Sequence, residues 1–253
     1  MMPVISSRHL ATAAFTLAAV ALFGLCGGAW ALSLGISPIN LFVIAPDKTG
    51  AMSLSNQTKV PARLQIRVFR WTQKDGVEVL APTRDVIANP PSMEIPPDQT
   101  YTVRVARISR VPLGAEESYR LILDELPSPI DPTAPVEGVR MLLRTSLPVF
   151  FSSKAVTPKI AWRVWNADGK LNIEAVNSGT RHIKLVDLAV EGPQGRTTFN
   201  SAGSNAYVLP GSTLRYASMT GATSYPVGTM VTITTAKGIP FEVKQQVAIT
   251  GGP

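Results

Sequence analysis

The chain has 253 residues, of which 45% are hydrophobic and 16% charged, and its formal net charge is +7 at pH 7. The composition excludes long disorder. The 21 prolines and 19 glycines argue against helix bundles and coiled coils, because they interrupt any long helical pattern. The basic residues are scattered rather than gathered in a run, so the charge gives little support to nucleic-acid binding. An all-β fold fits this composition best.

The first 31 residues have the features of a cleavable secretory signal peptide. Arg8 gives the N-terminal region its positive charge, and residues 10–25 form the apolar region. Ala29-Trp30-Ala31 has the small residues of a cleavage site, and we expect cleavage after Ala31. The run is too short and too rich in alanine and glycine for a membrane span, so we do not expect a membrane-embedded protein. The single cysteine, Cys26, lies in this leader. The sequence therefore predicts an exported protein that its hydrophobic core holds together without disulfides.

Residues 32–152 are predicted to form a first β-sandwich. Short apolar or alternating runs recur between turn residues, which is typical of antiparallel sandwiches. Leu64, Ile66 and Val68, for example, share one face of their run. We expect about seven strands, the number in one immunoglobulin-like domain. They are predicted at residues 36–44, 51–56, 62–71, 93–95, 100–108, 118–126 and 139–151.

Residues 153–253 are predicted to form a second immunoglobulin-like sandwich after a short linker-like passage. About seven further strands are expected in it, separated by turns that contain glycine. They are predicted at residues 161–165, 171–176, 183–190, 197–199, 214–217, 230–235 and 241–249.

Side chains that carry catalytic chemistry are scarce after the leader. His182 is the one histidine there and no cysteine remains, so nucleophilic catalysis and zinc binding lack their usual groups. An isolated histidine at the start of a strand is expected to be a solvated or hydrogen-bonded edge residue. Asp124 and Glu125 are adjacent in a strand and point to opposite faces, so they cannot share a substrate proton. We predict no enzyme activity, no metal and no cofactor.

The last strand candidate of the first sandwich, residues 139–151, has an unusual apolar pattern. Val139, Met141, Leu143 and Leu147 share one face of such a strand. The pattern by itself fits a core strand. However, a strand that ends a sandwich commonly lies at a sheet edge, where large apolar side chains invite strand addition by another chain.

Arg120 is the second unusual feature. Tyr119, Leu121 and Leu123 share a face of the strand predicted at residues 118–126, which leaves Arg120 on the opposite side. It is either a plain solvent-facing charge or, if a cleft between the sandwiches lies over it, a receptor for a carboxylate. The sequence alone leaves both interpretations open.

In these segments the chain resembles the periplasmic chaperones of the chaperone–usher pilus pathway, the PapD-like family, and in particular its archaic, Csu-type branch. The resembling residues are 64–71, 89–91, 117–127 and 144–150, which together span most of the first domain. Over the second domain the similarity is limited to the number of strands and the length.

The resemblance implies two immunoglobulin-like domains arranged as a boomerang, in the periplasm. Such a chaperone binds an incomplete pilus or fimbrial subunit by donor-strand complementation and delivers it to an outer-membrane usher. Val139, Met141 and Leu143 would then enter the subunit groove, with Leu147 nearer the cleft. Arg120 would anchor the subunit's terminal carboxylate.

The chain departs from the conventional members of that family. Those members anchor the carboxylate with an arginine on the first strand and a lysine on the last strand of the first domain. Here residues 36–41 contain no basic residue and Pro148 stands at the lysine position. The match to the archaic branch, which uses an arginine of the preceding strand, is what assigns the anchoring role to Arg120.

Two other classes of function remain open at this level. A secreted two-domain adhesion or carbohydrate-binding module would carry exposed tryptophan and tyrosine on loops, whereas Trp71, Trp162 and Trp165 fall in or beside predicted strands. An exported hydrolase would need a pair of acids near a pocket, for which the composition gives no support.

Overall fold

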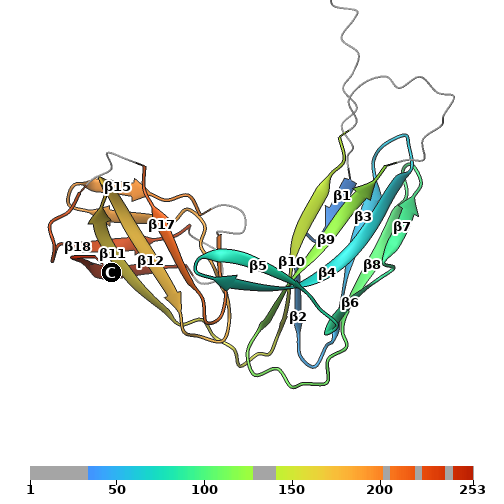
Figure 1. The fold of residues 1–253 in the computed structure, drawn as a ribbon, viewed down its shortest axis with the longest axis horizontal. Coiled ribbons are helices and arrows are strands. Elements are labelled where there is room, and N and C mark those ends of the chain that lie inside the picture. The colour runs from blue at the N-terminus through green and yellow to red at the C-terminus, as the bar shows by residue number, and fades with distance from the viewer. Residues whose placement is uncertain (1–33, 128–140, 202–205, 220–223, 237–241, 253) are drawn as a thin grey trace, which may run out of the picture. The chain divides into compact units, whose positions relative to one another are not determined.

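The computed structural model describes residues 34–127, 141–201, 206–219, 224–236 and 242–252. These residues form nineteen β-strands and no α-helix, which confirms the all-β prediction (Figure 1). No helix long and apolar enough to cross a membrane occurs in the described ranges. The predicted signal peptide, residues 1–31, lies outside them.

Two sheets make up the first sandwich. One has the order β1-β3-β8-β6, and the other has the order β2-β10-β9-β4-β5, with β7 also paired to β4. The strands are β1 (Leu34–Ser37), β2 (Leu41–Ile44), β3 (Thr49–Asn56), β4 (Ala62–Lys74), β5 (Val77–Pro82), β6 (Val86–Asn89), β7 (Ser92–Ile95), β8 (Thr100–Arg107), β9 (Glu117–Leu126) and β10 (Arg144–Ser152).

Alternation along the strands builds the core of this sandwich. Tyr119, Leu121 and Leu123 of β9 are at most 1% exposed and all point into it, as the sequence predicts. They pack with buried residues of both sheets, namely Leu41, Val43, Met52, Leu54, Leu64, Ile66, Val86, Ile95, Val103, Val105, Leu147, Val149 and Phe151.

The second sandwich contains the remaining strands. Its large sheet has the order β15-β14-β18-β19-β11-β12-β17, and β13 pairs with β16 separately. The strands are β11 (Ile160–Ala167), β12 (Lys170–Asn177), β13 (Ile183–Lys184), β14 (Ala189–Gly192), β15 (Gly195–Thr198), β16 (Tyr207–Val208), β17 (Thr213–Ala217), β18 (Met230–Thr234) and β19 (Lys244–Thr250). Their buried residues, among them Val164, Ile173 and Ile233, form a separate core.

Several predicted strands differ from the observed ones. Residues 36–44 are not one strand, because β1 pairs with β3 in one sheet whereas β2 runs parallel to β10 in the other. Pro38 lies at this change of sheet, where its missing N–H cannot support a continuous ladder. The prediction also missed β5 and β6. Strand β5 has no buried residue, so the core does not impose an apolar alternation on it.

Strand β10 is an edge strand along only part of its length. Its residues Val149–Phe151 lie between β9 and β2, whereas Arg144–Pro148 pair with β9 alone among the described strands. The predicted strand at residues 139–151 therefore begins later than expected, at Arg144. The strand ends at Ser152.

Candidate functional site

Arg120 lies in the middle of β9, flanked by the two neighbouring strands of its sheet. Its register partners are Phe69 of β4 and Pro148 of β10. Since Tyr119 and Leu121 point into the core, Arg120 leaves the sheet on the opposite face, as expected. It is nevertheless only 5% exposed. A plain solvent-facing charge is thus excluded for this residue.

The guanidinium of Arg120 is covered on its flat side and incompletely bonded at its edge. Its Cζ atom lies 3.6 Å from the ring centroid of Trp71, which gives a close cation–π contact. Its Nη2 atom donates a hydrogen bond of 2.9 Å to Oε2 of Glu78 on β5. Its Nε atom is buried and has no hydrogen-bond partner. The guanidinium therefore already binds one carboxylate, that of Glu78, and its Nε–H donor is unused.

A small aromatic cluster fixes the ring under the guanidinium. Trp71 packs with Phe150, Ala206, Tyr207 and Leu209 in a core separate from those of the two sandwiches. The Trp71 and Tyr207 rings meet edge to face, with centroids 5.5 Å apart. This packing leaves Trp71 only 1% exposed, so the platform for Arg120 is rigid.

Gln73 of β4 supports the same cluster by bonding to backbone in both directions. Its Nε2 donates to the carbonyl oxygen of Tyr207 at 2.7 Å, and its Oε1 accepts from the amide of Leu209 at 3.0 Å. The side-chain amide thus makes the same two kinds of hydrogen bond, one donated and one accepted, that a neighbouring strand would make with this backbone. The far end of β4 is thereby joined to the backbone around β16.

His182 is buried beside this cluster, at 5% exposure, so of the two expected settings, solvated or hydrogen-bonded, the solvated one is excluded. Its Nδ1 atom lies 2.5 Å from Oε1 of Glu116, which also accepts the backbone N–H of His182 at 3.0 Å. Its ring stacks on Phe150 with centroids 3.9 Å apart. The histidine is hydrogen-bonded, as predicted, and its ring packs against aromatic side chains.

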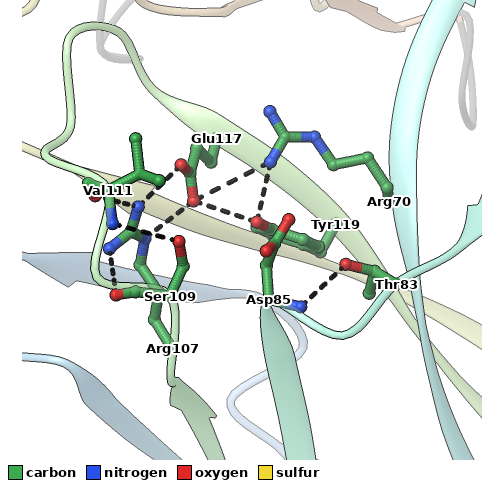
Figure 2. A network of polar contacts seen from close by, with 8 residues as sticks. All are labelled: Arg70, Thr83, Asp85, Arg107, Ser109, Val111, Glu117 and Tyr119. Atoms are coloured by element: carbon green, nitrogen blue, oxygen red, sulfur yellow. Dashed lines mark hydrogen bonds and ion pairs between the residues drawn. The ribbon is translucent and has the colours of Figure 1, made fainter.

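Figure 2 shows a second polar network on the opposite face of β9. Arg107 donates two hydrogen bonds of 2.8 Å to Glu117. The hydroxyl of Tyr119 donates to Glu117 at 2.9 Å and accepts from Arg70 at 2.7 Å. Burial raises the pKa of Glu117, but the hydrogen bonds from Arg107 and Tyr119 outweigh burial and lower the pKa below 4.5 overall. The network therefore keeps an ionised carboxylate at the start of β9.

Asp124 lies on the same face of β9 as Arg120, further along the strand. It accepts hydrogen bonds from Arg67 on β4 and from Arg144 on β10. Burial raises the pKa of Asp124, but the hydrogen bonds from Arg144 and Arg67 outweigh burial and lower it. This ion cluster fastens the start of β10 to the sheet.

The residues just before β10 form an exposed apolar segment, residues 141–143. Met141 is 77% exposed, Leu142 47% and Leu143 45%. The backbone of Leu143 nevertheless continues the contact with β9, because its carbonyl accepts the amide of Glu125 at 2.9 Å. Two of the predicted partner-binding side chains, Met141 and Leu143, are thus accessible. Val139 lies outside the described residues.

Leu147 does not belong with this segment. Its side chain is 5% exposed and packs in the core of the first sandwich together with Val149 and Phe151. The strand twists continuously and the sandwich closes over β10 beyond Ser146, so the apolar face that is accessible before β10 becomes internal within it. The expectation that Leu147 is available to a partner is therefore corrected.

The structure also bears on the other functional classes. Trp71, Trp162 and Trp165 are 1%, 8% and 6% exposed, so the tryptophans of the described residues are packing residues and not a surface platform. Groups of three or more potential metal ligands do not occur in the described part of the chain.

Glu78 is the site residue that the sequence did not reveal. It lies on β5, for which no strand was predicted. Strands β5 and β9 flank β4 in the sheet, and the side chains of Glu78 and Arg120 form an ion pair across it. A hairpin signal was present in Lys74-Asp75-Gly76, where Asp75 and Gly76 both have positive φ. That signal places β5 next to β4 but does not identify the partner of Glu78.

Comparison with known families gives one clear match for the first sandwich. The family described as "Pili and flagellar-assembly chaperone, PapD N-terminal domain" matches residues 33–157. No curated protein is significantly similar to the chain in sequence.

Solved structures match the chain across both sandwiches. A chain of the CsuC–CsuE chaperone–tip adhesion subunit pre-assembly complex from archaic Csu pili of Acinetobacter baumannii is 26% identical, with a TM-score of 0.62, and the match covers 87% of this chain and 100% of that one. The complex of Salmonella enterica SafA pilin with the SafB chaperone matches at 14% identity and a TM-score of 0.60, over 88% and 99% of the two chains. The Pseudomonas aeruginosa CupB2 chaperone matches at 13% identity and a TM-score of 0.54, and the match covers 85% of this chain and 100% of that one.

The two low-identity matches show the fold, and the Csu match is the one that also retains sequence similarity. Together with the family match, they confirm the resemblance and the two-sandwich fold inferred from the sequence. Residues 33–157 belong to the PapD-like family of pilus-assembly chaperones, as its N-terminal domain, and 87% of the chain is similar to a chain of the archaic Csu chaperone–subunit complex.

Proposed function

We propose that this protein binds fimbrial subunits in the periplasm by donor-strand complementation and delivers them to an outer-membrane usher. The observation that carries the proposal is the exposed apolar segment at residues 141–143, which runs directly into β10. Large apolar side chains at a sheet edge favour pairing with another chain. A subunit that lacks a strand offers the complementary groove.

The energetics of such a complex are adequate. Fully burying each of Met141 and Leu143 in a groove contributes about 1.5 to 3 kcal/mol. Val139 belongs to the same alternation and would add a third contribution. The ordering of both partners offsets part of this gain, which leaves a complex that forms readily and still permits exchange.

Arg120 is proposed to fix the register of the complex. It lies opposite Pro148, five residues along the register from the pair of Leu143 and Glu125. At about 3.3 Å per residue this separation is roughly 17 Å along the strand. A carboxylate bound at Arg120 would therefore set which subunit pockets receive the apolar segment, and a slip of one residue would turn those side chains outward.

Release at the usher is proposed to occur by strand exchange into a subunit strand that fits better, with no nucleotide consumed. The family to which the first sandwich belongs consists of chaperones and not of enzymes, which supports this non-catalytic role. Complexes such as that of SafA pilin with the SafB chaperone support subunits as the class of partner.

The test is co-expression with a candidate pilin, followed by recovery of the complex. We expect Met141→Asn to reduce recovery strongly, because it places an amide in an apolar groove. Met219→Asn is the matched control, since Met219 is 86% exposed and lies in the second sandwich. For the anchor, the double variant Arg120→Met with Glu78→Gln removes both charges and leaves no unpaired ion. Unchanged recovery of complex with both Met141→Asn and the double variant would contradict the proposal.

A further inference from the structure

Glu78 accepts a hydrogen bond from the guanidinium that is proposed above as the carboxylate anchor. Its Oε2 accepts the hydrogen bond from Nη2 of Arg120 at 2.9 Å. The side chain of Arg120 is 6% exposed, whereas that of Glu78 is 27% exposed and lies on an edge strand of its sheet. Glu78 therefore stands between the guanidinium and solvent.

The guanidinium is not fully satisfied by this contact. Its Nε is buried without a hydrogen-bond partner, although arginine presents five donors arranged to hold a carboxylate through two parallel bonds. The platform of Trp71 below it leaves the edge of the fork as the direction of approach. A single bond to Glu78 is a weaker arrangement than the bidentate pair that the same fork can form.

The strand that carries Glu78 does not contribute to the core. Val77 and Val79, its neighbours on β5, are 64% and 40% exposed. None of the six residues of β5 is buried. A rotation of the Glu78 side chain away from Arg120 thus breaks one ion pair and disturbs no packed group.

We propose that Glu78 is an intramolecular carboxylate that caps Arg120 in the subunit-free protein and exchanges with the terminal carboxylate of a bound subunit. The cap neutralises a buried guanidinium that would otherwise be costly without a partner. It also competes with the subunit, so it lowers the affinity and speeds release. The exchange with a subunit rests on the proposed chaperone function, whereas the capping of Arg120 does not.

The capping is tested with acetate as the probe, on the purified protein without any subunit. The readout is the NMR signal of the Arg120 Nε–H group, assigned by its loss in Arg120→Lys. In Glu78→Ala, acetate is expected to shift this signal to saturation, with a midpoint at least tenfold lower in concentration than in the unsubstituted protein. Glu94→Ala is the matched control, because Glu94 is also an ion-paired glutamate of this sheet but its pair with Arg63 is exposed. Equal responses of Glu78→Ala and the unsubstituted protein, or no response of Glu78→Ala, would overturn the capping.

The exchange is tested with the candidate pilin of the co-expression experiment. We expect Glu78→Gln to slow dissociation of the pilin complex at least fivefold, and Glu94→Gln to leave it unchanged. A pilin extended by two C-terminal glycines, whose carboxylate is displaced, should gain nothing from Glu78→Gln. Equal or faster dissociation of the Glu78→Gln complex would overturn the exchange. If no variant binds pilin, the chaperone proposal fails and the exchange fails with it, while the acetate experiment still decides the capping.

Discussion

Phe150 and His182 stack face to face, with ring centroids 3.9 Å apart and planes inclined by 16°. Phe150 belongs to β10, and His182 immediately precedes β13. The N-terminal end of β10 continues from the segment proposed to bind a partner. Its C-terminal end, at Phe150, contacts the second sandwich through His182. Glu116 holds the histidine ring in place through Nδ1.

Phe150→Ala should strongly destabilise the protein. The side chain is fully buried and contacts the rings of Trp71, Tyr207 and His182, so its removal leaves a cavity among aromatic groups. We expect the free energy of unfolding, measured by urea denaturation, to fall by about 3 to 5 kcal/mol. Phe42→Ala is the control, because Phe42 also stacks on Phe150 but is 48% exposed. Losses of equal size in the two variants would contradict this account of the cluster.

Leu147→Ala and Met141→Ala should separate stability from binding. Leu147 lies in the core, so its truncation is expected to lower the free energy of unfolding by about 2 to 5 kcal/mol. Met141 is 77% exposed, so its truncation is expected to change stability by less than about 0.5 kcal/mol. Only Met141→Ala should weaken pilin binding at a temperature where both variants remain folded. Denaturant titration and a pull-down with pilin measure the two effects, and a large stability loss in Met141→Ala would contradict the placement of this segment.

Glu117→Gln should reduce stability in a pH-dependent manner. The pKa of Glu117 is lowered in the folded state, so its ionised form contributes stability that is present above the unfolded pKa of 4.5 and is lost as pH falls through the lower folded pKa. We expect the variant to be about 3 to 5 kcal/mol less stable at pH 7, because Arg107 is left buried without its anion.

The difference between Glu117→Gln and the unsubstituted protein should narrow as pH falls below 4.5. Urea denaturation at a series of pH values between about 7 and 3 measures it. Glu94→Gln provides the exposed control. A difference that is constant with pH would show that the ionised carboxylate of Glu117 does not hold the network in Figure 2 together.

The fold was largely accessible from the sequence because burial imposes alternation. Their spacing alone predicted that Leu64, Ile66 and Val68 share one face, and likewise Tyr119, Leu121 and Leu123. All six lie against the core, Val68 partly buried and the other five buried. The same logic failed for Leu147, because the pattern continues from an exposed segment into a core strand without any change in period. Alternation identifies a face, but it does not say where along the strand that face becomes internal.

The candidate site was accessible only in part. Arg120 could be placed on the outer face of β9, but its burial could not be predicted, since the covering side chains come from β4, β5 and β16. The contact between Arg120 and Glu78 depends on the register of two strands that are not adjacent in the sheet. The hydrogen bond between His182 and Glu116 joins residues 66 positions apart in the sequence. Local sequence patterns carry no information about such pairs.

Hydrogen exchange at residues 141–143 tests the central claim most directly. These residues are exposed in the subunit-free protein, so their amides should exchange rapidly, apart from the Leu143 amide that bonds to Glu125. Upon addition of a pilin that forms a complex, strand pairing should slow exchange in this segment at least tenfold, as measured by mass spectrometry. A stable pilin complex in which residues 141–143 exchange as fast as in the free protein would contradict the account.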